Sequence, residues 1–341
     1  MTRLITARLM ATAVIATALG LAACGQQDAK PAASGPPKEL TFSILSAENQ
    51  ASTQPLWQPL LDDMSAQIGV PVKPYFATNY TSLVEAMRFK QVQLGWFSAS
   101  PALQAINRAD AEVLGRVVDA GGDGTYKSVI IVRKGSGVTL EKLLKCDKTL
   151  SFGMGDTQST SGTLAPKTYL FSPRNIEPQA CFKTVRSANH QANVFAVANG
   201  VMDAATNNSV GLVFAARQNP EIAKKVEVIW TSPPLPESSI VVRRDLDPAL
   251  KEKIRQFFLT YGIGSDAKAD KQREVLKGLA YGGFRPADNS YLNPVREMEA
   301  SESLSAARRS GDKAKIAKAQ AEFEKISAEV AATRAVDPSV P

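Results

Sequence analysis

The sequence predicts an α/β fold divided into two lobes, and three observations point to it. The chain has 341 residues, and because a single hydrophobic core stops growing near ~250–300 residues, this length favours two cores. Apolar residues make up 44% of the chain and charged residues 21%, which is typical of a globular protein. Up to about residue 260, strand-like runs alternate with helical patterns, as in an open, largely parallel sheet.

Strand and helix patterns alternate from the first strand onward. Residues 39–45 predict a strand, Leu56–Ile68 has apolar residues at helical spacing, and Val72–Phe76 predicts a second strand. Residues 301–334 are rich in Ala, Lys and Glu, with Gly311 as a turn signal, and predict a C-terminal helix or helical pair. The apolar stripe of this segment consists of Ile316, Phe323, Ile326 and Val330.

Residues 1–23 have the pattern of a secretory signal peptide, with Arg3 and Arg8 before an apolar run from Leu9 to Leu21. The ending Leu21-Ala22-Ala23-Cys24 resembles the bacterial lipobox, which implies cleavage before Cys24 and lipidation of its thiol. A plain signal peptide with a chance cysteine, or a short membrane anchor, are the alternatives, although the apolar run is short for a spanning helix.

Residues 24–38 are rich in Pro, Gly, Ala and Ser and predict a flexible tether. No later segment is apolar enough to span a membrane, so we expect a periplasmic or other extracytoplasmic protein held at the membrane by its lipid alone. Removal of residues 1–23 lowers the formal net charge from +7 to +5. The basic residues are dispersed among acidic ones, so no nucleic-acid partner is expected.

Three cysteines and one histidine limit the chemistry. They exclude a zinc ribbon and a His-rich metal site, and we expect no metal and no other cofactor. Cys146 and Cys181 each precede a strand-like run, Thr149–Gly153 and Phe182–Val185. Parallel pairing of these runs would bring the cysteines together, and outside the cytoplasm a disulfide persists, so we predict a Cys146–Cys181 bridge. Two unpaired buried thiols are the alternative.

A turn rich in Ser and Thr carries the main chemical signal, Gly155-Asp156-Thr157-Gln158-Ser159-Thr160-Ser161-Gly162. It follows a predicted strand and precedes a helix-like run, Thr163–Phe171. Free N–H groups at a helix N-terminus, together with hydroxyl donors, favour an anion. The segment lacks the Lys and the spacing of a nucleotide P-loop. A capped helix whose hydroxyls bond only their own backbone is the alternative.

Two segments of the chain resemble each other, Val84–Ser100 and Val194–Val210. Each contains a helix end, a turn, a strand of small residues and a polar loop at the carboxyl end of that strand. Similar units in two lobes indicate facing sites across a cleft. Tyr80, Tyr126 and His190 stand near these loops or near the predicted crossing between lobes, where each side chain can donate a hydrogen bond or merely pack.

In combination, these stretches resemble the phosphonate-binding periplasmic proteins of ABC importers, a family of phosphate, phosphite and phosphonate binders. The resemblance covers about residues 39–335 and implies a two-lobed, type II binding fold that closes on its ligand. We assign residues 39–130 and 234–341 to lobe 1 and residues 131–233 to lobe 2. The stretches that carry the resemblance are Tyr75–Tyr80, Ala86–Phe89, Gly153–Asp156, Ser159–Gly162, Ala196–Asn199 and Asp203–Asn208.

The resemblance also implies which residues bind the ligand. The matched positions all carry hydrogen-bond donors, and they are Tyr80, Tyr126, Ser159, Thr160, Ser161 and His190. Ser46 and Glu48 lie in the loop after the first strand, which borders the cleft. Family members can also pair through the C-terminal helix, so a homodimer is a hypothesis.

The sequence departs from the family where 2-aminoethylphosphonate binders place acidic residues around the ligand's ammonium. These positions are Val210 and Ser238, with Glu237 beside the latter. Because an unpaired buried ammonium is costly, we expect loss of aminoalkyl specificity and a ligand such as phosphite, phosphate or methylphosphonate. An inward-turned Glu237 would keep 2-aminoethylphosphonate as the alternative, and sulfate or selenate are further oxyanions to consider.

Three classes of function agree to different degrees with these motifs. A solute-binding lipoprotein that delivers an oxyanion to an ABC permease agrees with every motif above. A phosphoester-acting enzyme would need a nucleophile and a base, for which Ser159 or Thr160 with His190 is the candidate pair, but the neighbour Gln191 is no acid partner. We therefore expect that this protein is not an enzyme. An extracytoplasmic sensor without transport is the third class.

Overall fold

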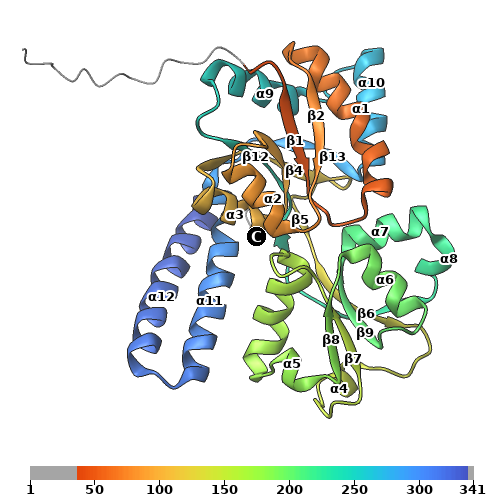
Figure 1. Ribbon diagram of the computed structural model, residues 1–341, viewed down its shortest axis with the longest axis vertical. Helices are drawn as coiled ribbons and strands as arrows, with labels where there is room; N and C mark the ends of the chain where they lie inside the picture. Colours follow the sequence, from red (N-terminus) through yellow and green to blue (C-terminus); the bar gives the residue numbers. More distant parts are fainter. Residues whose placement is uncertain (1–36, 337–341) are drawn as a thin grey trace, which may run out of the picture. The chain divides into compact units, whose positions relative to one another are not determined.

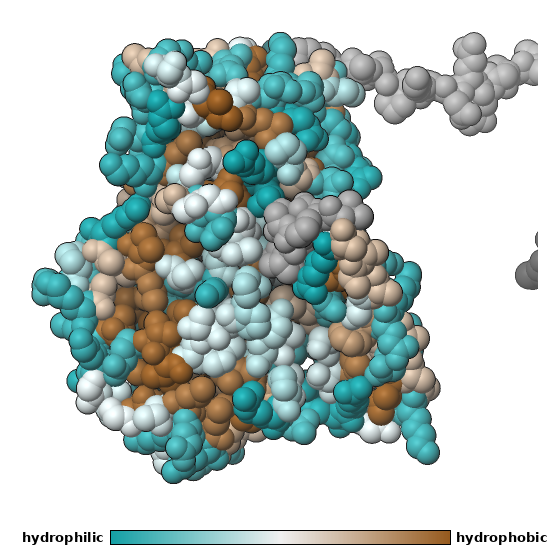
Figure 2. All heavy atoms as spheres, turned by 180° about the vertical axis from the view of Figure 1, so that it is seen from behind, coloured by the Kyte–Doolittle hydropathy of each residue, from teal (hydrophilic) through white to brown (hydrophobic). Residues whose placement is uncertain are grey.

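The computed structural model describes residues 37–336, and the predicted signal peptide, Cys24 and the tether up to residue 36 lie outside the described residues. The described chain forms a six-stranded and a five-stranded sheet, one in each lobe (Figure 1). Within residues 37–336 no helix combines the length and the apolar character needed to cross a bilayer. Seen from behind, lobe 1 and the C-terminal helices are largely hydrophilic, whereas apolar side chains gather on lobe 2 (Figure 2).

The sheet of lobe 1 has the strand order β13-β4-β12-β3-β1-β2. Its two faces are covered by different helices, and each face has its own apolar core. Phe42, Trp57 and Phe258 belong to the core on the side of α1 and α9, and Leu83 and Phe97 to the core beneath α2 and α3. The strands and helices are β1 (Leu40–Ile44), α1 (Gln50–Ile68), β2 (Val72–Phe76), α2 (Tyr80–Arg88), β3 (Leu94–Phe97), α3 (Ala99–Arg108), β4 (Ala111–Asp119), β12 (Ser239–Arg243), α9 (Pro248–Thr260), α10 (Ala267–Gly278) and β13 (Tyr281–Arg285).

The sheet of lobe 2 has the order β10-β6-β9-β7-β8. Stacked and edge-to-face rings of Phe152, Phe171 and Phe182 form the centre of its core. Its elements are β6 (Ser128–Arg133), α4 (Leu140–Leu143), β7 (Ser151–Met154), π-helical turns η1 (Thr160–Leu164) and η2 (Lys167–Phe171), the 3₁₀ turn η3 (Ser172–Arg174), α5 (Pro178–Cys181), β8 (Thr184–Ser187), α6 (His190–Ala198), β9 (Ala204–Asn208), α7 (Ser209–Gln218), α8 (Pro220–Ala223) and β10 (Val226–Thr231).

The chain crosses twice between the lobes, through β5 (Thr125–Tyr126) and β11 (Leu235–Pro236), which pair antiparallel. The expectation of largely parallel sheets is wrong, because three of the five strand pairings in the sheet of lobe 1 and two of the four in the sheet of lobe 2 are antiparallel. β1 pairs in parallel with β2 and β3, and β7 with β8 and β9, but β12 and β6 run antiparallel to their neighbours. These two strands follow a crossing, so they enter their sheet from the opposite end. Since β6 pairs in the second sheet from Ser128 onward, the proposed boundary after residue 130 falls inside a strand.

The C-terminal segment is a helical pair, as predicted. A 3₁₀ turn, η4 (Asn289–Leu292), leads into α11 (Asn293–Ser310), which packs along α12 (Lys313–Val336) (Figure 1). Gly311 between them has a left-handed backbone with φ 69°, which glycine adopts without steric cost. Of the predicted apolar stripe, Ile326 and Val330 are buried, and Phe323 packs against them.

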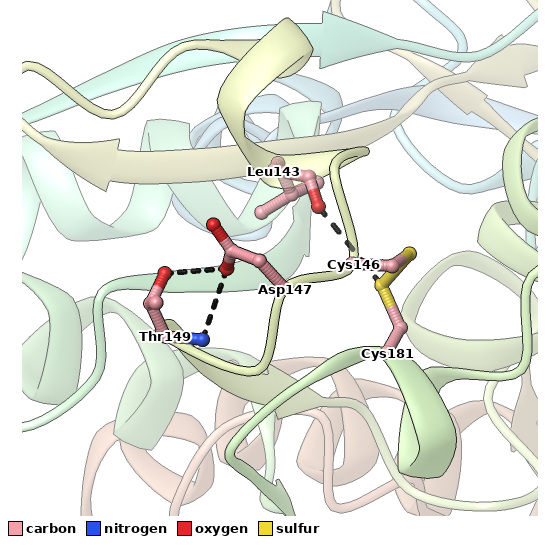
Figure 3. The surroundings of a disulfide bond; sticks show 5 residues. All are labelled: Leu143, Cys146, Asp147, Thr149 and Cys181. Atoms are coloured by element: carbon pink, nitrogen blue, oxygen red, sulfur yellow. Dashed lines mark hydrogen bonds between the residues drawn. A yellow bond between two sulfur atoms is a disulfide. The ribbon is translucent and has the colours of Figure 1, made fainter.

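The predicted disulfide is present between Cys146 and Cys181 (Figure 3). The register of β7 and β8 places Ser151 opposite Thr184, so that the segments before both strands meet at one end of the sheet. Beside the bridge, the Asp147 carboxylate accepts hydrogen bonds from the backbone N–H and the hydroxyl of Thr149, which lower the pKa of Asp147. The bridge therefore fastens the loop between α4 and β7 to α5.

Replacement of both cysteines, Cys146→Ser with Cys181→Ser, should lower the free energy of unfolding by about 2–4 kcal/mol, because the bridge restricts the unfolded chain. The cysteines are 35 positions apart in the sequence. Urea unfolding of the wild type with and without reductant measures the effect, and the double variant serves as the control that no longer responds to reductant. A wild type that unfolds identically under both conditions would contradict the prediction.

Candidate ligand-binding site

Helix N-termini from both lobes converge on the cleft, each directly after the carboxyl end of a strand or its loop. In lobe 1 the N-cap residues are Asn79 of α2 and Ser98 of α3. In lobe 2 they are Ser159 of η1, Asn189 of α6 and Asn208 of α7, and each of these three side chains accepts a hydrogen bond from a backbone N–H of the first turn. Unpaired N–H groups and helix dipoles at such ends favour a negative charge.

The two segments that resemble each other in sequence form matching units, α2–β3 in lobe 1 and α6–β9 in lobe 2. The structural match also includes residues before these segments. The shift of 110 residues that relates Asn79-Tyr80 to Asn189-His190 also relates Ser98 to Asn208. Tyr80 and His190 are therefore equivalent residues, each the first residue of a helix that begins at the cleft. The sequence contained a signal for this, since both helices are capped by an asparagine.

Two glycines shape the turn that holds Ser159, Thr160 and Ser161. The Gly155 N–H donates to the Gly162 carbonyl at 2.8 Å, and a Cβ on Gly155 would lie only 2.5 Å from the Gly162 Cα. The Ser159 hydroxyl caps the first turn by accepting from the Gly162 N–H at 2.9 Å. The helix consequently begins at Thr160, three residues earlier than predicted, and its first turn is π-helical, a geometry frequent at functional sites.

A cavity of about 60 Å³ lies where these elements meet. Sites for drug-sized ligands measure roughly 300–1,000 Å³, so this cavity fits only a small ligand. Most of the predicted site residues line it, namely Glu48, Tyr80, Tyr126, Ser159, Ser161, His190, Val210, Glu237 and Ser238. Ser46 and Thr160 do not line it. Sequence reasoning missed the lining side chains of Trp57, Trp96, Ser98, Asn208 and Tyr281.

Ser161, His190 and Asn208 form a compact polar group at one wall of the cavity. The Asn208 amide donates to the Ser161 hydroxyl at 3.2 Å, and His190 Nε2 lies 3.4 Å from the same oxygen. Burial lowers the pKa of His190 to about 4, so the imidazole is neutral at pH 7 and keeps one N–H donor. Its Nδ1 is buried and has no partner among the described residues.

Tyr80 and Tyr126 add phenol hydroxyls to the lining of the same cavity. Tyr80 begins α2, and Tyr126 lies in β5, at the crossing between the lobes. Burial raises the pKa of both phenols, so both keep their protons at neutral pH. The Ser159 hydroxyl is the hydrogen-bond partner of Tyr80, and the Ser161 hydroxyl is a hydrogen-bond partner of Tyr126. A tetrahedral oxyanion in the cavity would thus meet neutral donors from both lobes and from the crossing.

The acidic groups of the cavity are the carboxyls of Glu48 and Glu237, and neither Lys nor Arg is among its lining residues. Burial raises the pKa of Glu48 to about 8 and also raises the pKa of Glu237. Glu237 Oε1 accepts from the Ser238 N–H at 2.9 Å and from its hydroxyl at 3.0 Å. Glu237 Oε2 is buried without a partner among residues 37–336.

Direct hydrogen bonds join the lobes, so the cleft is closed. The Tyr80 N–H donates to Asp156 Oδ2 at 3.2 Å, and the His190 N–H donates to the Ala47 carbonyl at 3.1 Å. Thr160 takes part in this closure, because its hydroxyl oxygen accepts from the Ser100 N–H at 2.8 Å. N–H groups at helix ends of one lobe are thereby satisfied by groups of the other.

The fold and the cavity together define a two-lobed solute-binding protein. A family model described as the periplasmic phosphonate substrate-binding protein of ABC transporters matches residues 42–292, and the chain belongs to this family. The phosphonates-binding periplasmic protein of Escherichia coli K12 is 39% identical over 262 residues, which cover 76% of each chain. Members of this family are binding components of transporters and not enzymes.

Solved structures agree with this assignment. A binding protein component of an ABC phosphonate transporter from Pseudomonas aeruginosa is 33% identical, with a TM-score of 0.82 over 87% of this chain and 100% of that chain. PhnD1 of Prochlorococcus marinus, solved with methylphosphonate, is 23% identical, with a TM-score of 0.69 over 77% of this chain and 97% of that chain. The second likeness concerns the fold alone. The type II fold expected from the sequence is thereby confirmed.

The substitution Glu48→Gln should change how stability depends on pH. Folding raises the pKa of Glu48 from 4.5 to about 8, so the folded state binds more protons than the unfolded state between these values. The contribution of Glu48 is fully present below pH 4.5 and is lost as the pH rises through 8. Without ligand, the Tm of the wild type should fall by several degrees relative to the variant between pH 5 and pH 8.5.

Differential scanning calorimetry of both proteins across this range measures the difference. His190 titrates with the opposite sign, since its lowered pKa removes stability as the pH falls from 6.5 toward 4. Its contribution is common to both proteins and cancels in the comparison. A Tm difference that does not vary with pH would show that Glu48 does not titrate in this way.

Proposed function

We propose that this protein is the solute-binding lipoprotein of an ABC importer and captures a small phosphorus oxyanion, namely a phosphonate, phosphite or phosphate, between its lobes. The observation that carries the proposal is the closed cavity of about 60 Å³ onto which helix N-termini and neutral donors converge. Tyr80, Tyr126, Ser159, Ser161 and His190 present these donors. Thr160 supports the same turn through its bond to Ser100.

Neutral donors suit a transport protein, which must bind its ligand tightly and also release it. Each hydrogen bond from a neutral group to a charged oxygen contributes about 1.5–3 kcal/mol, and several together give strong binding. Because the donors come from both lobes, an oxyanion links the lobes and favours closure, a hinge motion about the paired strands β5 and β11. Opening of the hinge on the permease separates the donors and releases the ligand.

The proposed partners follow from this role. The permease of an ABC importer and its ATPase accept the ligand, and a lipid on Cys24 keeps the protein at the membrane surface, with residues 25–38 as the tether. A homodimer through the C-terminal helices belongs to the same proposal. Its support is the extended α11–α12 pair, which projects from lobe 1 (Figure 1).

Loss of one donor should weaken oxyanion binding. We expect Ser161→Ala and His190→Ala each to raise the Kd for the tightest-binding phosphorus oxyanion by roughly 10–100-fold, which corresponds to one hydrogen bond to a charged group. A thermal-shift panel of phosphonates, phosphite, phosphate and sulfate identifies that ligand, and calorimetry gives its Kd. Ser303→Ala, on the exposed surface of α11, is the matched control and should bind as the wild type does.

The same panel can contradict the proposal. If no phosphorus oxyanion raises the Tm of the wild type, the cavity does not bind this class of ligand. If Ser161→Ala and His190→Ala both retain the wild-type Kd, the oxyanion does not bind at the turn described above.

Anchoring by lipid should depend on Cys24 alone. In bacteria that process lipoproteins, the wild type should incorporate labelled palmitate and sediment with membranes, whereas Cys24→Ser should do neither, because the other two cysteines of the sequence, Cys146 and Cys181, form the disulfide. Cys146→Ser with Cys181→Ser is the control and should still be labelled. Equal labelling of the wild type and the Cys24 variant would refute the lipid anchor.

A further inference from the structure

One contact between the lobes lies outside the ligand cavity and is made by the side chain of Gln191. The Asn49 N–H of lobe 1 donates to Gln191 Oε1 at 3.1 Å, and Gln191 Nε2 donates to the Ser52 hydroxyl oxygen at 3.2 Å. One amide group of lobe 2 therefore both accepts from and donates to the start of α1. None of the three residues lines the ligand cavity, and all three line a separate pocket.

Gln191 completes the capping of α1 from the other lobe. The N–H of Ser52 is satisfied by the side chain of Asn49, the N-cap residue. The N–H of Asn49 itself has the Gln191 side chain as its partner. Because a backbone N–H can only donate, it holds the amide oxygen of Gln191 and leaves the NH₂ group for Ser52. Lobe 1 thus sets the orientation of this amide, and it can do so only while the lobes are closed.

The contact lies directly beside a residue of the ligand cavity. Gln191 follows His190, whose side chain lines the cavity and whose N–H donates to the Ala47 carbonyl of lobe 1 at 3.1 Å. Two consecutive residues of α6 therefore make three hydrogen bonds to residues 47–52. A movement that separates Gln191 from α1 also moves His190, since both belong to the first turn of one helix. Closure of the lobes and placement of the imidazole are coupled through this segment.

Comparison of the two lobes shows that the fold does not require the Gln191 contact. The shift of 110 residues relates Tyr80 to His190, and the N–H of each donates to the opposite lobe. The same shift relates Thr81 to Gln191, but Thr81 is exposed and makes no hydrogen bond to lobe 2 within residues 37–336. Helix α2 therefore begins at the cleft without such a side chain. Gln191 adds to the closure of the lobes and is not needed to start its helix.

These two hydrogen bonds belong to the closed state. When the lobes separate, the amide of Gln191, the N–H of Asn49 and the hydroxyl of Ser52 bond to water instead, because none of the three residues is fully buried. The apparent affinity of a protein that must close on its ligand rises with the fraction of closed molecules. Two hydrogen bonds of ordinary net strength change the ratio of closed to open molecules by roughly tenfold.

We propose that Gln191, with Asn49 and Ser52 as its partners, is an interlobe latch that holds the closed state and slows ligand release without touching the ligand. The inference rests on the proposed function, because the lobes close on that ligand. Gln191 is a positioning residue, since it acts through the closed state and through its neighbour His190. The latch forms after the lobes have met, so it lowers the dissociation rate and leaves the association rate nearly unchanged.

Stopped-flow tryptophan fluorescence tests the latch, because the rings of Trp57 and Trp96 line the cavity and report on its occupation. Methylphosphonate, phosphite and 2-aminoethylphosphonate are the probes, and the one that binds the wild type most tightly is used for all variants. Gln191→Leu keeps a side chain of similar size but removes both hydrogen-bonding groups. We expect it to raise the dissociation rate and the Kd about tenfold, with an association rate within about twofold of the wild type.

Ser52→Ala removes one of the two partners and should raise the dissociation rate about threefold. In the Gln191→Leu background the same change should have no further effect, because the two side chains act as a pair. Gln218→Leu is the matched control, since Gln218 lines the same pocket but makes no hydrogen bond to lobe 1 in the described part of the chain. It should release the probe at the wild-type rate.

The latch is overturned if either Gln191→Leu or Ser52→Ala releases the probe at the wild-type rate, or if Gln191→Leu acts on the association rate alone. It is also overturned if Ser52→Ala has the same effect in both backgrounds, which would give Ser52 a role within α1 only. Should Gln191→Leu fail to fold, the dissociation rate of Ser52→Ala decides. In all these cases the wild type still binds its probe and the proposed function stands. Failure of all three probes to bind the wild type would refute the proposed function, and the latch with it.

Discussion

The structure depends on the need to satisfy backbone N–H groups at helix ends that meet in the cleft. A helix leaves its first N–H groups without intrahelical partners, and α2, α3, η1, α6 and α7 all begin at the same place. N-cap side chains such as Asn79, Asn189 and Asn208 satisfy some of these groups. Groups of the opposite lobe satisfy others, as Asp156 does for Tyr80. Since the N-cap or first residues of these helices line the cavity, an oxyanion bound there would be a further partner for such groups.

The same constraint shows how the proposed site could hold an anion without a basic side chain. Helix dipoles and hydroxyls already provide a positive potential, and a Lys or Arg would have to be desolvated in a cavity of about 60 Å³. The same cavity is also lined by the rings of Trp57, Trp96 and Tyr281 and by the carboxyls of Glu48 and Glu237.

Local patterns were sufficient for most of the elements, and they placed most of the predicted site residues at one cavity. The strand, the Ser/Thr turn and the helix start at residues 149–171 could be predicted because caps and glycine turns are short-range features. The Cys146–Cys181 bridge followed from two strand starts that proved to be neighbours. Antiparallel β6 and β12 could not be predicted, since their direction depends on where the chain crosses between lobes. The roles of Thr160, which faces Ser100, and of Trp57 depend likewise on contacts between distant segments.

By itself, the sequence determined the class of fold, the family and the disulfide, because the signals for them lie in short local patterns. Only the tertiary structure decided the charge balance of the cavity. Val210 and Ser238 suggested that the acidic half of the site was lost. Folding brings Glu48 from the other lobe to Gly211 and turns Glu237 into the cavity. These carboxyls come from segments that lie far apart in the sequence, so local sequence patterns do not show that they meet at one cavity.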